Sequence, residues 1–299
     1  MELLDLLFLV IFFVCLSRGS GFILTSLPLR PPPPPIDYDK ANFHKVLEAA
    51  GKTVLRPGGS DASDKLQSWA CDILTKESHV VELACGLGNG GLSIAQTYGC
   101  HVLLTDMDES RLELAQQKAK KLDVNHLVDT QRVDMFHDME KLGAFDCAII
   151  EASLTHFERN KKRDILRGLS RHAPVLLIHE VCLVDCQEDS PDAKTLEKNM
   201  AKALRIGFFP ETMKRWEQLV QDAGYQVDHH HHVETGPLGL LKPVNIVKDE
   251  GIVGFLKILG TLVTNSDLRT RVKSTKKTVQ ENSKNLRYII IMASKKNLT

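Results

Sequence analysis

Continuous runs of hydrophobic residues alternate with segments of helical periodicity along the middle of this chain. Between the runs, apolar positions recur every three or four residues, which is typical of helices. Strands are expected over residues 80–84, 101–105, 130–133, 147–151 and 175–179, and helices over residues 63–75, 90–98, 109–122 and 161–170. Apolar strands separated by helices predict a buried parallel sheet. The predicted fold class is therefore α/β, with a doubly wound, Rossmann-like sheet.

The same pattern continues toward both ends of the chain. A helix is expected over residues 42–50, and a turn-rich segment follows over residues 52–59. The last strand is expected over residues 286–293, after a long and mainly helical insertion. From Lys257 to Arg287 this part of the chain holds eight lysines and arginines against Asp267 and Glu281. It is interpreted either as a solvated helix face or as a surface that attracts an anionic acceptor or a membrane.

The first residues form a predicted targeting segment. Leu6 to Leu16 is an apolar run too short to cross a bilayer comfortably, which is typical of a signal-peptide core. Gly19 and Gly21 provide the small residues for cleavage after Gly21, although Glu2 and Asp5 stand where basic residues are usual. Phe22 after the cut resembles the bipartite presequence of algae with secondary plastids. Delivery to a plastid through the endoplasmic reticulum is expected, with secretion or an uncleaved membrane anchor as alternatives.

Composition narrows the class of protein without identifying it. The chain has 299 residues, 25% of them charged, and a formal net charge of zero, so bulk charge gives no case for nucleic-acid binding. The seven cysteines lack the spacing of a metal finger or a disulfide scaffold and are interpreted as reduced thiols. His229 to His232 are predicted to lie in an exposed strand or loop without a metal, because neighbours in a strand point to opposite faces.

A glycine-rich turn carries the strongest chemical signal. Gly86, Gly88 and Gly91 fit a Gly-x-Gly-x-x-Gly pattern between a strand and a helix, and the next predicted strand ends on Asp106. This order suits a nucleoside site in which the acid accepts hydrogen bonds from ribose hydroxyls. The pattern alone leaves a dinucleotide and S-adenosylmethionine (SAM) open. Glu82, four residues before Gly86, favours SAM, because SAM carries a positive amino group and no pyrophosphate.

The segment from Glu82 to Gly90 resembles motif I of the class I SAM-dependent methyltransferases, with Ala84 where many members have glycine. Asp106 resembles the ribose-binding acid of this family, Asp134 the acid that contacts the adenine amino group, and 145–151 its fourth strand. The resemblance implies a seven-stranded fold with a helical insertion between strands six and seven, and SAM as the cofactor. The cofactor-binding residues implied are Glu82, Ala84, Gly86, Gly88, Asp106, Met107, Asp134, Met135 and Glu151.

Three residues are candidates for catalysis at the acceptor. His156 is a candidate base because the ordinary pKa of histidine is near neutrality, and its alternative is a surface loop position. His179, with Glu180, is predicted to end the fifth strand, either as acid/base machinery or as a satisfied polar pair at the sheet's edge. Glu151 is predicted to hold the cofactor's ammonium or to orient an acceptor. Ligands of such sheets lie beyond the carboxyl ends of the strands, so these residues should surround one crevice.

The acceptor is predicted to be a small molecule, because segments such as 55–59 and 236–243 resemble the UbiE-like methyltransferases. The leading hypothesis is S- or O-methylation of a thiol or acidic metabolite, for example in methylated-sulfur metabolism. The alternatives are C-methylation of a prenylated quinol and a non-catalytic SAM-binding protein. No nucleic-acid partner is expected. Peripheral membrane contact through the basic insertion is a second expectation, and the oligomeric state stays open.

These inferences divide the chain into six parts. The expected parts are a signal peptide (1–21), a transit-like, proline-rich linker (22–40), an N-terminal helical segment (41–78), the SAM-binding core (79–241), a basic helical cap (242–285), and the last strand with its tail (286–299).

Overall fold

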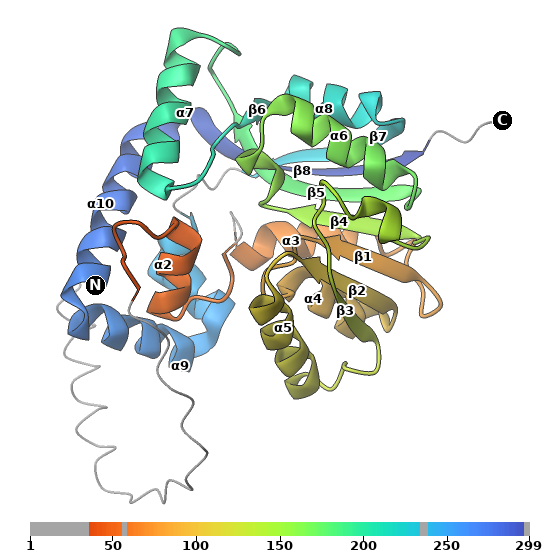
Figure 1. Cartoon of the computed structure of the whole chain (residues 1–299), viewed down its shortest axis with the longest axis horizontal. Helices are drawn as coiled ribbons and strands as arrows, with labels where there is room; N and C mark the ends of the chain where they lie inside the picture. The colour runs from red at the N-terminus through yellow and green to blue at the C-terminus, as the bar shows by residue number, and fades with distance from the viewer. Residues whose placement is uncertain (1–35, 56–58, 234–238, 296–299) are drawn as a thin grey trace, which may run out of the picture.

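The computed structural model describes residues 36–55, 59–233 and 239–295 (Figure 1). The apolar run, the cleavage position after Gly21 and the proline run lie outside the described residues, so the targeting segment stays a prediction. Among the described helices, none combines the length and the apolar character needed to span a bilayer.

The described strands form one mixed sheet. They are β1 (His79–Leu83), β2 (His101–Asp106), β3 (Val128–Arg132), β4 (Cys147–Glu151), β5 (Val175–Leu183), β6 (Glu211–Thr212), β7 (Tyr225–Val233) and β8 (Leu286–Lys295). The order across the sheet is β3-β2-β1-β4-β5-β8-β7, and the short β6 pairs with the end of β5. Only β8 runs antiparallel to its neighbours. This topology confirms the predicted doubly wound α/β fold.

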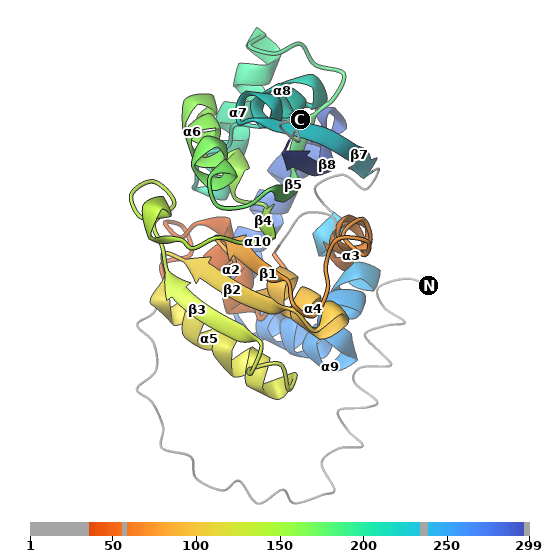
Figure 2. The same ribbon diagram turned by 90° about the vertical axis from the view of Figure 1, so that its right-hand side faces the viewer.

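Helices cover both faces of this sheet (Figure 2). One face is covered by α3 (Gly59–Ser68), α4 (Asn89–Tyr98) and α5 (Glu109–Lys121), and the other by α6 (Arg159–Ser170) and α8 (Met213–Asp222). Val80 belongs to the hydrophobic core between the sheet and α3, α4 and α5, and its neighbour Val81 to the core between the sheet and α6 and α8. Successive side chains of a strand point to opposite faces, so this alternation is expected. The central strands are therefore buried on both sides, which explains their continuous apolar sequences.

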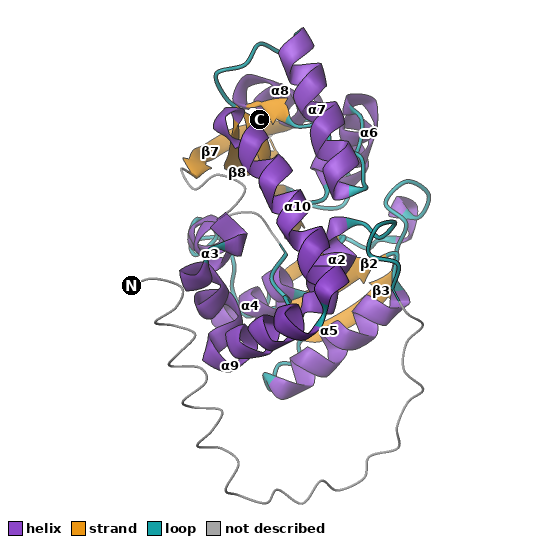
Figure 3. Cartoon of the chain, turned by 90° about the vertical axis from the view of Figure 1, so that its left-hand side faces the viewer, coloured by secondary structure: helices purple, strands orange, loops and turns teal. Residues whose placement is uncertain are grey.

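Four further helices gather at one end of the sheet and form what we call the cap (Figures 1 and 3). They are α2 (Phe43–Ala50), α7 (Pro191–Leu204), α9 (Pro243–Thr264) and α10 (Ser266–Asn282). Leu268 of α10 is fully buried against Phe43 and Val46 of α2, so the two ends of the chain share one small core. The predicted helical insertion between the last two strands is confirmed, whereas α7 was not predicted. Short 3-10 turns complete the fold: η2 (Met139–Lys141), η3 (Leu154–His156), η4 (Gly239–Leu241) and η5 (Ser283–Asn285).

Two predicted boundaries need correction. The helix expected over residues 63–75 lies at Gly59–Ser68 and gives way to turns before β1. The fifth strand continues to Leu183 because it pairs along its whole length with antiparallel β8, from Val175 opposite Ser294 to Leu183 opposite Leu286. His179 and Glu180 therefore lie inside this strand, and the prediction that they end it was wrong.

Candidate functional site

A cavity of about 390 Å³ opens at the carboxyl ends of β1, β2 and β4, between the sheet and the cap. Ligands of doubly wound sheets bind at this edge. Of the residues predicted to bind the cofactor, those that line the cavity are Glu82, Ala84, Gly86, Asp106, Met107, Met135 and Glu151. The structure therefore brings together residues that the sequence distributes over the ends of four strands, β1 to β4.

The turn after β1 is shaped by backbone positions that favour glycine. Gly86 and Gly88 have φ values of 55° and 70°, and Ala84 also lies in the left-handed region at 50°. Gly91 faces β2 so closely that an added Cβ would lie 2.5 Å from Leu104 Cδ2 and 2.7 Å from Val102 Cγ1. An added Cβ on Gly88 would lie 2.7 Å from Leu104 Cδ1, and Gly88 does not line the cavity. Its contribution is close packing of helix on strand.

Two carboxylates hold this turn in place. Glu82 is buried, and its Oε2 accepts a hydrogen bond of 2.7 Å from the backbone N–H of Gly91. Asp106 accepts 2.9 Å and 3.0 Å bonds from the backbone N–H groups of Gly86 and Asp108. Both acids also line the cavity. Backbone donors therefore fix both carboxylates at the cavity, and their binding of the cofactor stays a prediction.

The predicted adenine contact lies differently. Asp134 is not among the residues that line the cavity, and its Oδ1 accepts a 2.8 Å bond from the backbone N–H of Phe136. Its neighbours Val133 and Met135 line the cavity instead. The segment identified from the sequence is thus in position, but its apolar side chains face the cavity and its carboxylate supports the turn.

Glu151 is held by two buried neighbours. Its Oε1 accepts a 2.8 Å bond from the hydroxyl of Ser63 on α3, and His179 Nδ1 lies 3.9 Å from the same oxygen. His179 is fully buried, is not among the residues that line this cavity, and meets the Tyr288 ring edge-on at 5.9 Å between centroids. The structure therefore places His179, a predicted catalytic residue, behind Glu151 and away from the cavity.

Glu180 organises the loop that follows β4. This fully buried carboxylate accepts hydrogen bonds of 2.9, 2.6 and 3.1 Å from the backbone N–H groups of Ser153, Leu154 and Thr155, and a 2.6 Å bond from the Thr155 hydroxyl. Burial raises the pKa of Glu180, and these four donors oppose that rise. The loop they fix, η3, ends on His156, so Glu180 supports the candidate base from behind.

His156 is anchored by one ring nitrogen. Its Nδ1 lies 2.8 Å from the carbonyl oxygen of Gly207, which can only accept, so Nδ1 carries the proton and Nε2 the lone pair. An added Cβ on Gly207 would lie 2.6 Å from the His156 carbonyl oxygen, so glycine permits this close approach. Burial lowers the pKa of His156 below its ordinary value. His156 is only partly exposed and lines the cavity, so it is not a fully exposed loop residue.

A second histidine, which the sequence did not single out, lies against the first. The rings of His44 on α2 and His156 meet edge-on at 5.2 Å between centroids. Burial, followed by the nearby charges of His156 and Arg111, lowers the pKa of His44 to about 3. Both imidazoles are therefore neutral near pH 7. A histidine inside an amphipathic helix has no sequence signal that separates it from a core position.

The two histidines mark the junction of the large cavity with a smaller one, which we call the apolar chamber. It has a volume of about 80 Å³ and shares His44, Leu55, Ala152 and His156 with the large cavity. The remaining described lining residues come from the cap, η3, β5, the loop before β6, η4 and β8: Phe43, Leu47, Thr155, Val181, Met200, Leu204, Phe208, Leu241, Val279 and Tyr288. Among the described residues that line the chamber, none is a lysine, arginine, aspartate or glutamate.

The strap over residues 52–55 closes the large cavity from the cap side. Glu250 of α9 accepts bonds of 2.7 and 2.9 Å from the backbone N–H groups of Thr53 and Val54, and a 2.7 Å bond from the Thr53 hydroxyl. Lys52 Nζ lies 3.1 Å from Asp249, and both side chains are almost fully buried. Thr53 and Leu55 line the cavity, so the helical insertion helps to complete the site.

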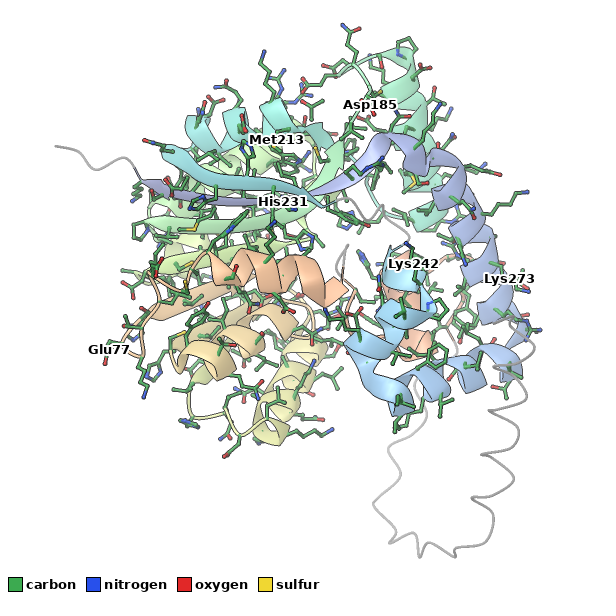
Figure 4. All side chains as sticks on the ribbon, turned by 180° about the vertical axis from the view of Figure 1, so that it is seen from behind. Glu77, Asp185, Met213, His231, Lys242 and Lys273 are labelled. Atoms are coloured by element: carbon green, nitrogen blue, oxygen red, sulfur yellow. The ribbon has the colours of Figure 1, made fainter. Side chains whose placement is uncertain are left out.

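The histidine run lies on β7, at the edge of the sheet, where Figure 4 labels His231. His229 and His230 are exposed, and His230 Nδ1 lies 2.9 Å from Glu217 Oε1. Within residues 36–55, 59–233 and 239–295, no group of three histidines, cysteines or acids is arranged to hold a metal ion. The described cysteines are free thiols.

Comparison with known proteins identifies the core. A sequence profile described as a methyltransferase domain matches residues 80–174. An uncharacterized protein of Haemophilus influenzae is 30% identical over 257 residues, which are 84% of this chain and 97% of that protein. A SAM-dependent methyltransferase from Geobacter sulfurreducens, solved with S-adenosyl-L-homocysteine, superposes with a TM-score of 0.61 at 12% identity and covers 84% of this chain and 98% of its own. The [4+2]-cyclase SpnF superposes with a TM-score of 0.59 at 16% identity and covers 86% and 93%.

Proposed function

Because the chain belongs to the class I SAM-dependent methyltransferases, we propose that it methylates a small acceptor at sulfur or oxygen, with the acceptor bound in the apolar chamber beside His156. The observation that carries this proposal is the junction of the two cavities at His156 and His44. A base at this junction would stand between a cofactor in the large cavity and an acceptor in the chamber.

The donor set of the large cavity fits SAM. Among the described residues that line it, three carry carboxylates, namely Glu82, Asp106 and Glu151, and one is an arginine, Arg111, which pairs with Glu48 at 2.8 Å. A cavity with this excess of negative charge suits a ligand with an ammonium and a sulfonium, and it opposes a pyrophosphate. SAM supplies an electrophilic methyl group. The residues that would hold it are Glu82, Gly86, Asp106 and Glu151.

The lining of the chamber narrows the range of possible acceptors. Its side chains are mainly aliphatic and aromatic, with the two neutral imidazoles, the Thr155 hydroxyl and the Tyr288 phenol as polar groups. Placing a carboxylate there without a cationic partner would incur a large desolvation cost. Of the two leading classes of acceptor, a thiol or hydroxyl on an apolar body therefore fits better than an acidic metabolite.

The protonation state of His156 favours sulfur as the atom that is methylated. The ring lines both cavities and carries its lone pair on Nε2, as the Gly207 contact requires. A base with a lowered pKa removes a proton most effectively from an acidic group. A thiol ionises far more readily than an aliphatic hydroxyl. The remaining work of the enzyme is alignment and exclusion of water, which the cap and the strap serve.

The decisive experiment is a transfer assay with radiolabelled methyl groups, run on purified protein with fractionated metabolites from the source cell. We expect label in a low-molecular-weight thiol or hydroxyl compound of apolar character. Val279→Phe, which enlarges a side chain of the chamber, should raise the acceptor KM about tenfold and leave cofactor affinity unchanged. Leu114→Phe, on an exposed position of α5, is the matched control. Label in a carboxylate product would exclude the proposed acceptor class.

The same protein and metabolite fractions distinguish two other candidate functions. Phe208 adds an aromatic side chain to the lining of the chamber and supports C-methylation of a prenylated quinol as the second candidate. Label on the ring carbon of a quinol would establish it. SpnF, described as a cyclase, is similar in fold to this chain, so a non-methylating protein is the third candidate. Cofactor binding by titration calorimetry without label in any fraction would favour that class.

A further inference from the structure

Large hydrophobic side chains are exposed mainly on one helix of the cap. Nine of them are exposed in the described part of the chain, and five of these lie on α9. Ile252, Val253 and Val263 have exposed fractions of 68%, 67% and 61%. Contiguous apolar surface on a folded protein marks an interaction site more often than a scattered residue does. The clustering on α9 therefore indicates an interaction site.

Four of the five exposed residues share one face of the second half of α9, and the fifth, Val244, lies in the first half. Ile252, Leu256 and Val263 follow helical spacing, and Val253 lies beside them, whereas Ile258 points inward and is buried. Gly251, with φ of 71° and ψ of 170°, interrupts the helix just before this face. The interruption separates it from Asp249 and Glu250, which hold the strap. The two halves of α9 thus have different contacts.

The insertion that carries this face has a positive exposed surface. Residues 251–264 contain a single charged side chain, Lys257, and no acid. Seven lysines of the described insertion are exposed: Lys242, Lys248, Lys257, Lys273, Lys276, Lys277 and Lys284. Figure 4 shows Lys273 on the outer side of α10. Two of the four acids in this region, Asp249 and Glu250, are withdrawn from the surface by the buried Lys52. The exposed surface of the insertion therefore combines aliphatic side chains with lysines.

We propose that residues 252–264 of α9 dock on the surface of an anionic lipid membrane. A helix with an apolar face and nearby lysines lies in the plane of the interface, where the apolar side chains enter the headgroup region and the lysines meet lipid phosphates. None of the described helices is able to span a bilayer, so the contact is peripheral. A second copy of this chain fits less well, because a symmetric contact would bring like charges together.

The test is co-sedimentation of the full chain with vesicles of phosphatidylcholine, alone or mixed with phosphatidylserine. We expect binding to the mixed vesicles, weakened by salt. The triple variant Ile252→Ser, Leu256→Ser, Val263→Ser should reduce the partition coefficient by at least about tenfold. Lys257→Glu should give a smaller loss. Leu114→Ser removes a side chain of 51% exposure from α5 and should leave binding unchanged.

Each other outcome overturns the proposal. The N-terminal apolar run is present in every variant, so binding that survives the triple substitution would assign membrane contact to that run. A dimer in analytical ultracentrifugation that dissociates in the triple variant would assign the face to self-association. Unchanged cofactor affinity and circular dichroism establish that the variants are folded. The result is independent of the acceptor, because no methyl transfer is measured.

Discussion

The large cavity, proposed to hold the cofactor, and the apolar chamber, proposed to hold the acceptor, are built in different ways, and we call them the cofactor side and the acceptor side. The cofactor side comes largely from one βαβ unit, in which Glu82 and Asp106 are fixed by backbone N–H groups of the glycine turn and the residues after β2. The acceptor side is assembled from distant segments, with His44 near the start of the described chain, His156 in the middle and Tyr288 on the last strand. A turn can specify a nucleoside site locally, whereas an acceptor pocket depends on how the whole cap packs.

The two sides also differ in polarity. Carboxylates dominate the large cavity, and aliphatic and aromatic side chains with neutral imidazoles dominate the chamber. This contrast suits a cationic cofactor beside a neutral acceptor. It also means that substitutions on the two sides should change different kinetic constants, and the variants below use that separation.

The largest effect is expected on the acceptor side, from His156→Ala. Removing a general base typically lowers turnover by about 100-fold or more. Cofactor affinity should change less than about threefold, because Glu82, Asp106 and Glu151 are untouched. Turnover and calorimetric titration measure the two quantities. His126→Ala, at an exposed histidine after α5, is the control. A parallel loss of both constants would mean that His156 belongs to the cofactor side.

Gly91→Ala tests whether the cofactor side depends on close packing of its backbone. Alanine gains about 1 kcal/mol of helix propensity, but overpacking of a core costs about 1–3 kcal/mol. The added methyl would meet buried Leu104 and Val102, which have no room to withdraw, so the overpacking should win. Thermal unfolding should show a melting temperature lower by several degrees. Gly143→Ala, whose Cβ meets nothing within 4 Å, should be neutral.

The difference between the locally built cofactor side and the acceptor side assembled from distant segments explains how much of the molecule could be predicted from the sequence. The order of strands and helices, the glycine turn, Glu82, Asp106 and Glu151 follow from local patterns, and the structure brings these three acids to one cavity. The position of the Asp134 carboxylate could not be predicted in this way. Its segment was identified correctly, but the direction of the carboxylate depends on the turn to Phe136.

The acceptor side shows which features local sequence patterns cannot predict. His44 has no local signal, since its role depends on α2 meeting η3. The prediction for His179 depended on where β5 ends, and that is set by pairing with a strand from the far end of the chain. The buried group of Lys52, Asp249 and Glu250 is likewise a contact between remote segments. Long-range packing, rather than composition, determines these features.

Asp106→Ala should weaken cofactor binding about tenfold, a smaller effect confined to the cofactor side. The substitution removes an acceptor for ribose hydroxyls and two bonds to backbone N–H groups. Titration calorimetry with SAM gives the dissociation constant. Asp129→Ala, an exposed acid on β3, should bind normally. If affinity did not change, the assignment of Asp106 to the ribose would be withdrawn, although the fold would stand.

The smallest effect is the response of turnover to pH, and it tests the burial of the acceptor side directly. A base acts in its neutral form, so protonation of His156 reduces turnover only as the pH falls through its pKa. Because burial lowers that pKa below the usual value of about 6.5, most of the enzyme is already competent at pH 6.5.

With saturating cofactor and acceptor, turnover should change less than about twofold between pH 6.5 and 7.5 and decline only in more acidic buffer. His44, with a pKa of about 3, does not titrate in this range and so does not obscure the result. An acid limb centred at or above pH 6.5 would mean that His156 is solvated. The junction of chamber and cavity would then not be closed, and the acceptor assignment that depends on it would be withdrawn.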